Sequence, residues 1–530
     1  MILSDRDLSQ IDVDYLDKLP ETRLRTLSKD LLADLKTARE RLNQSPATSS
    51  RPPSSQAPWT TSTQEQPQPD DELPQTDEPV EPTVDTTSSE HSEKTESSES
   101  PTPPTDDTPP DTTKKAGRQP GSAGHSRQLT LPVTQTVQHA PECCAGCGQL
   151  FNESHKRLLW NARYELELEP GSEDRPALQI QHTRHEYWVI SCDCGHQTHA
   201  EPGRCPDDPE WSVAVSEWHL CGPRLVSFLV YMALFMRTSR RRIQDFLHTW
   251  LGIDLSTSTI NQCIHEAARA VEPVVDEQLV PELNASDLLH IDETPWKESG
   301  KLLWLWVFVG SYTVVYKVGK RHRLIVQQLL GDIFNGFLMT DGFSVYRIFP
   351  KRLRCWAHLV RKARALHQCL DSQGQAFGEA LLLGMIILMR NIHRLREGPD
   401  DPDALKAQNQ QLLAWIHTLC EIQQTLEHED SRKLAVEFLN DWDAIMRVVE
   451  TPAHPLTNNV AERSLRHWVL LRKITFGSRT AQGSRVIALL ASVIDTARLR
   501  DLNPWDFIAQ VLAARRKNLP APTLPMCALA

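Results

Sequence analysis

Three acidic residues lie far apart in the chain, in segments that could bring them together. Asp292 and Asp341 each belong to a short apolar, β-branched segment typical of a strand, and Glu462 begins a segment with helical periodicity. Three carboxylates on two strands and a helix can converge at a sheet edge and hold two divalent cations, for which such ligands favour Mg²⁺ or Mn²⁺. Two such ions activate an attacking oxygen and stabilise a leaving one in phosphoryl transfer. The residue types therefore predict cleavage or transfer of phosphodiesters.

Simpler interpretations of these acids exist. Asn459 with Glu462 three residues later matches a capping-box-like arrangement at a helix start. Other acids in the same part of the chain, Glu293, Asp332 and Asp495, show that carboxylates alone do not identify a site.

Basic residues accompany the candidate acids. Residues 345–365 contain seven basic residues and no acid, and six more follow Glu462 with no acid before Asp495. Cationic stretches beside a metal site are what a polyanionic substrate requires. We therefore expect DNA contacts from His358, Arg361, Lys362, Arg463, Arg466, Arg472 and Lys473.

The acidic net charge of −12 at first argues against a nucleic-acid partner, because phosphate contacts need Lys and Arg. However, residues 46–115 hold 15 acidic against 4 basic residues, and 14 of the prolines. Such a segment cannot bury enough apolar surface to offset the cost of ordering its backbone, so a disordered linker is predicted. The other residues are close to neutral, and their basic clusters can bind a polyanion.

Two cysteine groups predict a structural zinc site. Cys144 and Cys147 have the spacing of a Cys-x-x-Cys knuckle followed by glycine, whereas Cys192 and Cys194 are one residue closer than that pattern. His196, His199 and Cys205 remain possible substitutes for one ligand, and reduced thiols without metal are the alternative. Strand-like stretches at 163–168 and 177–190 lie between the two groups, so we expect a small β-rich module closed by zinc.

Helical patterns occur on both sides of this module. Before it, leucines at mixed spacings of three and four after Pro20 predict a helix that self-associates as a short coiled coil, or docks on its own domain. After it, an apolar helix is expected over 222–236. Two further helices are expected: an amphipathic one with Arg240, Arg241 and Arg242, and a second one capped by Ser256 or Ser258. The pair resembles a helix-turn-helix, or forms an ordinary helical hairpin.

The chain then changes to strand patterns from residue 290. A meander of three strands, a short helix over 323–330 and a fourth strand ending on Asp341 are expected, followed by helices over about 374–450. The longest apolar runs, 225–236, 302–309 and 380–389, fall short of the about 20 residues of a membrane-spanning helix. We therefore expect a cytoplasmic protein without a membrane span.

Several motifs, taken in order, resemble the DDE transposases of the insertion sequence sixty-six family. They are His290 to Pro295, Thr340 to Tyr346, Cys355 to His358 followed by Arg361 and Lys362, Asn458 to Arg466, and Ile494 to Arg498 with Leu502 to Pro504. The resemblance implies a ribonuclease H-like catalytic core with Asp292, Asp341 and Glu462 as the metal-binding triad, interrupted by a helical insertion. It also implies DNA as substrate, at the ends of a bacterial insertion sequence and in the target, and companion proteins of the same element.

The expected fold is mixed α/β. Its parts are an N-terminal helical or coiled-coil segment over 1–45, the linker over 46–128 ending in a basic tract, a zinc-binding module over 129–210, a helix-turn-helix-like region over 211–283, a catalytic domain over 284–516 and a tail over 517–530. The expected activity is metal-dependent DNA nicking and strand transfer by a homo-oligomer in the bacterial nucleoid. A non-catalytic element-derived DNA-binding protein and a structure-specific nuclease with the same core remain the alternatives.

Overall fold

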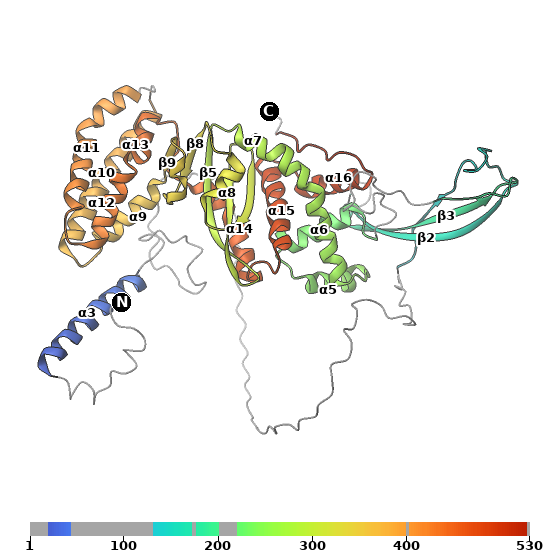
Figure 1. Ribbon diagram of the computed structural model, residues 1–530, viewed down its shortest axis with the longest axis horizontal. Helices are drawn as coiled ribbons and strands as arrows, with labels where there is room; N and C mark the ends of the chain where they lie inside the picture. Colours follow the sequence, from blue (N-terminus) through green and yellow to red (C-terminus); the bar gives the residue numbers. More distant parts are fainter. Residues whose placement is uncertain (1–19, 44–130, 172–175, 201–219, 399–401, 527–530) are drawn as a thin grey trace, which may run out of the picture. The chain divides into compact units, whose positions relative to one another are not determined.

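The computed structural model describes residues 20–43, 131–171, 176–200, 220–398 and 402–526. These residues all belong to one of two compact units, which comprises 1–56 and 129–530. The predicted linker, its basic tract and Cys205 lie outside the described residues. A mixed α/β fold is confirmed for the described part (Figure 1).

A five-stranded mixed sheet carries the first two candidate acids. Its strands are β5 (Leu288–Glu298), β6 (Lys301–Val309), β7 (Val314–Gly319), β8 (Phe337–Thr340) and β9 (Arg352–Arg354). Their order is β7-β6-β5-β8-β9, in which β5, β6 and β7 form an antiparallel meander and β8 and β9 run parallel to β5. Between β7 and β8 lies α8 (Arg323–Leu330), and a 3₁₀ turn, η5 (Ser344–Ile348), precedes β9. The predicted meander, short helix and fourth strand are confirmed.

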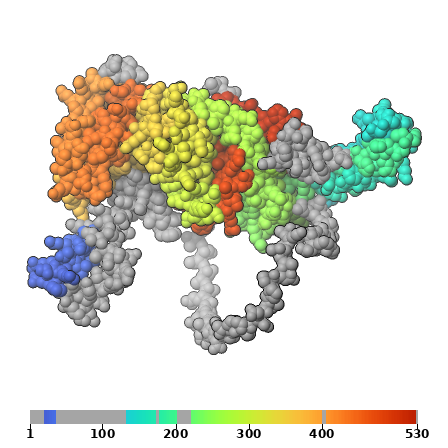
Figure 2. All heavy atoms as spheres, viewed as in Figure 1, coloured from blue at the N-terminus to red at the C-terminus, as the bar shows by residue number. Residues whose placement is uncertain are grey.

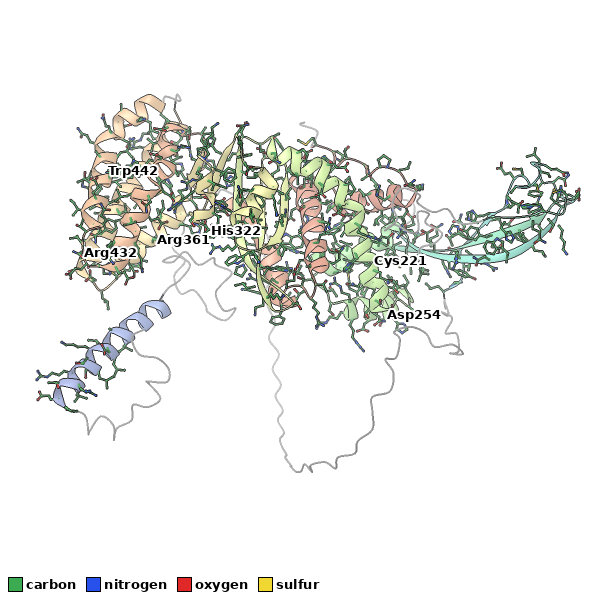
Figure 3. The ribbon with its side chains drawn as sticks, viewed as in Figure 1. Cys221, Asp254, His322, Arg361, Arg432 and Trp442 are labelled. Carbon is green, nitrogen blue, oxygen red and sulfur yellow. The ribbon has the colours of Figure 1, made fainter. Side chains whose placement is uncertain are left out.

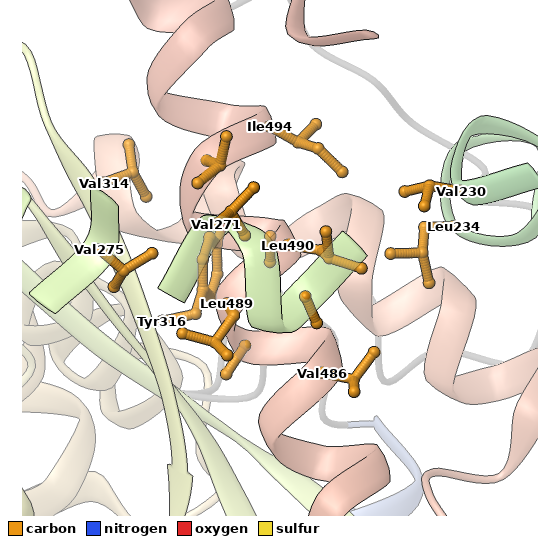
Figure 4. Close-up of a cluster of buried hydrophobic side chains, with 14 of the residues drawn as sticks. Val230, Leu234, Val271, Val275, Val314, Tyr316, Val486, Leu489, Leu490 and Ile494 are labelled. Atoms are coloured by element: carbon orange, nitrogen blue, oxygen red, sulfur yellow. The ribbon is translucent and has the colours of Figure 1, made fainter. Parts of the chain in front are cut away.

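Helices from the C-terminal part of the chain pack against this sheet. After α14 (Asn459–Thr475) come α15 (Ala481–Leu499) and α16 (Pro504–Arg516), and α15 packs against β7. Val314 and Tyr316 of β7 meet Leu489, Leu490 and Ile494 of α15 in one buried cluster (Figure 4). The strand residues are apolar and β-branched or aromatic, which suits a sheet buried under a helix.

A group of helices is inserted between β9 and α14. It follows α9 (Trp356–His367) and consists of α10 (Ser372–Arg396), α11 (Pro402–Gln423), α12 (Glu429–Asn440) and α13 (Trp442–Glu450), with α13 packed against β9. In the space-filling view the orange insertion lies against the yellow sheet region (Figure 2). Among the described helices, α10 alone is long and apolar enough to cross a membrane, and its residues Phe377, Leu381 and Met385 are buried in the insertion's own core.

The helices before the sheet are α4 (Pro223–Val230), continued by a π-helical turn, η3 (Tyr231–Phe235), then α5 (Arg240–Leu251) and α6 (Thr257–Pro273). Another π-helical turn, η4 (Val274–Leu279), and α7 (Val280–Asn284) lead to β5. Ser239 caps α5, the left-handed Gly252 (φ 63°) ends it, and Ser256 caps α6 through the backbone N–H of Thr259. The expected pair of helices around a glycine-containing turn is confirmed, with Ser256 rather than Ser258 as the cap.

The remaining elements precede these helices. The N-terminal helix α3 (Glu21–Asn43) begins directly after Pro20 as expected, and its assembly into a coiled coil stays a prediction. A four-stranded sheet follows, with β1 (Gln135–His139), β2 (Lys156–Glu169), β3 (Gln179–Ser191) and β4 (Gln197–His199). β3 lies between β1 and β2 and also pairs with β4. The long antiparallel β2–β3 pair confirms the two predicted strands of the cysteine-rich module.

Candidate active site

Asp292 and Asp341 lie at matching positions relative to two neighbouring parallel strands, β5 and β8. β5 and β8 pair with His290 opposite Met339, and each aspartate lies two residues further along the chain. Residues two apart on a strand lie on the same face, so the register directs both carboxylates to one side of the sheet. Asp292 accepts a hydrogen bond from the backbone N–H of Glu293, and Asp341 accepts one from that of Phe343, each at 2.9 Å.

Glu462 reaches the same region from α14, which packs against β5 and β6. Burial raises the pKa of Glu462; Arg361 and Arg466 oppose this rise, and the negative charge of Asp341 adds to it. Its buried Oε1 atom has no hydrogen-bond partner in the described part of the chain. Such an atom is costly to leave unpaired, so its position favours a cation or a ligand.

The pKa of Asp292 is raised well above its usual value, first by burial and then by the negative charges of Glu293, Asp341 and Glu462. The carboxylates therefore interact electrostatically, although residues 292 and 462 are far apart in sequence. Nevertheless, the carboxylate oxygens of the three candidate acids do not all lie within 4.8 Å of one another. Carboxylates that repel one another at one side of a sheet fit divalent cations placed between them, as Mg²⁺ or Mn²⁺ would be.

A fourth acid, Glu293, lies next to Asp292 and was not predicted as a site residue. Burial, followed by the charge of Asp341, raises the pKa of Glu293 to about 7, against the opposing effects of Tyr346 and Arg321. The Tyr346 hydroxyl donates to Glu293 at 2.7 Å, and Arg321 pairs with it at 2.7 Å. The Arg321 guanidinium also lies 3.9 Å from the ring centroid of Phe343. The neighbouring position of two acids on one strand was the only signal in the sequence.

Asn458, rather than Asn459, precedes the first residue of α14, and its side chain caps no helix N–H group. The predicted capping-box-like arrangement is therefore wrong. The Asn458 Nδ2 atom instead donates to the carbonyl of Ile291 at 2.8 Å, and its Oδ1 accepts from His290 Nδ1 at 3.0 Å. Because these bonds join the start of α14 to the strand that carries Asp292, Asn458 positions Glu462 against the sheet.

Replacing Asn458 with alanine should weaken metal binding by the three acids without removing any of them. Groups that orient metal ligands typically contribute about 10–100-fold to metal affinity. We expect a loss of that size in the affinity for Mn²⁺, measured by calorimetric titration. The matched control is Asn459→Ala, whose side chain is exposed and which should stay within about twofold of the native affinity. Equal effects of the two substitutions would contradict the positioning role.

Four of the seven basic residues over 345–365 are paired with two acids within the protein. The contacts are Arg347, Arg352 and Arg354 with Asp441, and Arg354 and Lys362 with Glu437. Both acids belong to the helical insertion or its connections, far away in sequence. The pairing leaves less cationic charge for a substrate than the sequence suggested. Arg361, labelled in Figure 3, lies on α9 near Glu462 and forms no salt bridge among the described residues.

The other predicted DNA contacts differ in their exposure. Arg472 donates to the hydroxyl of Thr294 at 2.8 Å and to the carbonyl of Pro295, so it joins α14 to β5. His358 is largely buried beside Glu462. Arg240 is partly buried, whereas exposed side chains are found at Arg241, Arg242, Arg463, Arg466 and Lys473.

The four predicted zinc ligands lie together. The sulfurs of Cys144, Cys147, Cys192 and Cys194 all lie within 4.8 Å of one another, with Cys144 and Cys194 at 3.7 Å and Cys147 and Cys192 at 3.6 Å. Tetrahedral zinc with Zn–S bonds of about 2.3 Å places sulfurs about 3.8 Å apart, so the donor set fits this ion. Left-handed glycines, Gly148 (φ 75°) and Gly195 (φ 86°), follow the two pairs and turn the chain there.

Zinc retention by this cluster should fall in acid. Burial alone would raise the pKa of Cys144, but the backbone N–H groups of Cys147 and Gly146 lower it to about 6. Because zinc binds thiolates, the zinc affinity should fall about tenfold per pH unit for each thiol that takes up a proton as the pH falls. Metal analysis after dialysis at several pH values measures this. The variant Cys147→Ser should lose the ion from this cluster. The control is Cys143→Ser, because Cys143 is exposed and lies outside the cluster. Equal zinc contents of the two variants would contradict the assignment.

Comparison with known proteins places this fold in a family. The model of the family described as "Transposase IS66 family" matches residues 219–486. Two uncharacterized Sinorhizobium fredii proteins are similar: y4qI is 23% identical over 315 residues, which is 52% of this chain and 57% of that protein, and y4hP is 24% identical over 328 residues, 55% and 59% respectively. The chain therefore spans somewhat over half the length of these relatives.

The matched segment extends from the helices before the sheet, across both aspartates, the helical insertion and the helix that carries Glu462, into the start of α15. It covers half of the chain, and the uncharacterized relatives add sequence similarity without a defined activity. The chain belongs to the IS66 transposase family.

Proposed function

We propose that the protein is a DDE transposase that nicks DNA at the ends of a bacterial insertion sequence and joins the freed 3′-hydroxyl to target DNA. The observation that carries this proposal is the β5–β8 register, which brings Asp292 beside Asp341, together with the packing of α14, which carries Glu462, against β5. The strand order, with a meander followed by two strands parallel to its first strand, supports a ribonuclease H-like core. Family membership supports DNA as the substrate.

In this proposal, Asp292, Asp341 and Glu462 hold two Mg²⁺ or Mn²⁺ ions. When bound, the ions supply activation of the attacking oxygen and stabilisation of the leaving oxygen. The protein fixes the carboxylates through the β5–β8 register and through Asn458, so that their geometry is set before DNA binds. Water is the nucleophile in nicking, and the 3′-hydroxyl takes its place in strand transfer.

Exposed cations on α14 and α5 supply the proposed DNA contacts. Arg463, Arg466 and Lys473 follow Glu462 along α14, where they would neutralise backbone phosphates near the reacting bond. Arg241 and Arg242 lie at the start of α5, the first helix of the proposed helix-turn-helix. We leave Lys362 and Arg472 out of this surface, because Glu437 and the end of β5 already bind them.

The proposed assembly uses other parts of the chain. The helix α3 exposes Leu24, Leu32 and Leu35, which suits self-association through a coiled coil. The four-cysteine module would hold a structural zinc ion. Companion proteins of the same element and a location at the bacterial nucleoid complete the proposal.

The proposal is tested by incubating the full chain with DNA that spans both flanks of its reading frame, in Mg²⁺. Strand-specific nicks mapped at the element's two boundaries are the expected result. Binding of those boundaries without any metal-dependent nick would support the non-catalytic alternative. Nicks that follow DNA structure instead of the boundaries would support a structure-specific nuclease.

A further inference from the structure

Cys355, His358 and Glu462 form a second group of metal-binding side chains. The Cys355 sulfur, a ring nitrogen of His358 and a carboxylate oxygen of Glu462 all lie within 4.8 Å of one another. Apart from the four-cysteine cluster, no other such group of three occurs among the described residues. The group contains neither Asp292 nor Asp341, so it overlaps the proposed magnesium site only at Glu462.

Local structure explains why the first two ligands come together. Cys355 directly precedes α9, and His358 is the third residue of that helix. Residues three apart at a helix start lie on one face, so a Cys-x-x-His pair offers sulfur and nitrogen to the same point. The backbone N–H of Asn458 donates to the Cys355 sulfur at 3.2 Å, which brings the start of α14 and its Glu462 against the pair.

The free atoms of the group point to a ligand. His358 Nδ1 and Glu462 Oε1 are 3.9 Å apart, beyond hydrogen-bond distance, and both are buried without a hydrogen-bond partner in the described residues. Zinc bonds of about 2.0–2.3 Å place ligand atoms about 3.3–3.8 Å apart in a tetrahedron. A small closure of the group would therefore satisfy both atoms. The Cys355 side chain is completely buried, which protects a metal–sulfur bond from solvent.

We propose that Cys355, His358 and Glu462 bind one transition-metal ion of the zinc class. Sulfur, imidazole and carboxylate donors together suit Zn²⁺ or a similar borderline ion and do not suit Mg²⁺, which prefers oxygen. With three protein ligands, the site keeps one coordination position open. Because the ion occupies Glu462, it competes with Mg²⁺ for this carboxylate or is bridged to Mg²⁺ through it. Binding of the ion does not rest on the proposed strand-transfer activity.

Zinc content of the full chain, purified with zinc and then dialysed, tests this site. We expect about two ions per native chain, one in each cysteine-containing site, and about one in Cys355→Ser, His358→Gln or Cys147→Ser. The double variant Cys147→Ser with Cys355→Ser should hold none. Cys420→Ser, at an equally buried cysteine of α11, is the control and should keep both ions. One ion per native chain, or an unchanged content in folded Cys355→Ser and His358→Gln, would overturn the proposal.

Cobalt substitution gives a second measurement, which uses the native chain and does not depend on whether a variant folds. Co²⁺ bound by four sulfurs and Co²⁺ bound by one sulfur, one nitrogen and oxygen differ in their visible absorption bands. Titrating the native chain with Co²⁺ should show both sets of bands. A spectrum of the four-sulfur type alone, at saturation, would contradict the second site.

Discussion

Replacing Glu462 with glutamine should lower the rate of DNA nicking by about 10³-fold or more. Glutamine keeps the size of the side chain but removes the negative charge that helps to hold the proposed divalent cations. These ions contribute several kcal/mol to transition-state stabilisation, and each 1.36 kcal/mol corresponds to a factor of ten in rate. Single-turnover nicking of boundary DNA in Mg²⁺ measures the effect, and Asp292→Asn should give a loss of similar size.

Asp287→Asn is the matched control for these substitutions. Asp287 is exposed and lies directly before β5, the strand that carries Asp292, so it is a nearby aspartate outside the acid group. Its nicking rate should remain within about twofold of the native rate. Full activity of Glu462→Gln, in protein whose thermal unfolding is unchanged, would remove Glu462 from the catalytic group.

Replacing Arg354 with methionine should lower the free energy of unfolding by about 3–5 kcal/mol, the cost of breaking a buried ion pair. Arg354 and Asp441 are both completely buried, and Arg354 also binds Glu437. The Arg354 Nη2 atom donates to the carbonyl of Asp341 at 3.1 Å. Methionine would leave Asp441 with less compensation and would release the backbone beside a proposed metal ligand, so nicking should also slow. Urea unfolding and single-turnover nicking measure the two effects.

The variant Lys362→Met shows how much of the stability loss comes from burial of the ion pair and how much from loss of a positive charge. Lys362 binds the same Glu437, but a third of its side chain is exposed, and exposed pairs are worth about 1 kcal/mol or less. We therefore expect a small change in stability. If Arg354→Met and Lys362→Met cost the same, the buried network does not hold the insertion against β9 in the way described.

Elements whose determinants are local in sequence could be predicted well. The apolar, β-branched runs gave the meander, because such residues favour strands, and Gly252 marked the end of α5, because a left-handed residue commonly ends a helix. The cysteine pairs were found although Cys192 and Cys194 depart from the usual spacing. Their geometry depends on two turns and on the pairing of β2 with β3, which brings the turns together.

Features that depend on distant partners could not be predicted. The capping interpretation of Asn459 used only its immediate neighbours, whereas Asn458 is held by His290 and Ile291, far earlier in the chain. Charge counting over 345–365 could not anticipate that Asp441 and Glu437 would form ion pairs with several of its basic residues. Glu293 was passed over for a related reason, since its partners come from distant segments, Tyr346 from η5 and Arg321 from the connection between β7 and α8.

Strand transfer by the native chain is the most direct test of the central claim. A DNA end already cut at the element boundary, with a free 3′-hydroxyl, is mixed with a supercoiled target plasmid and the full chain. In Mg²⁺ or Mn²⁺ the account predicts joined product, with none in EDTA and none with Glu462→Gln. Joining at an equal rate in EDTA, or bound ends that are never joined in Mg²⁺, would contradict a metal-dependent transposase built on Asp292, Asp341 and Glu462.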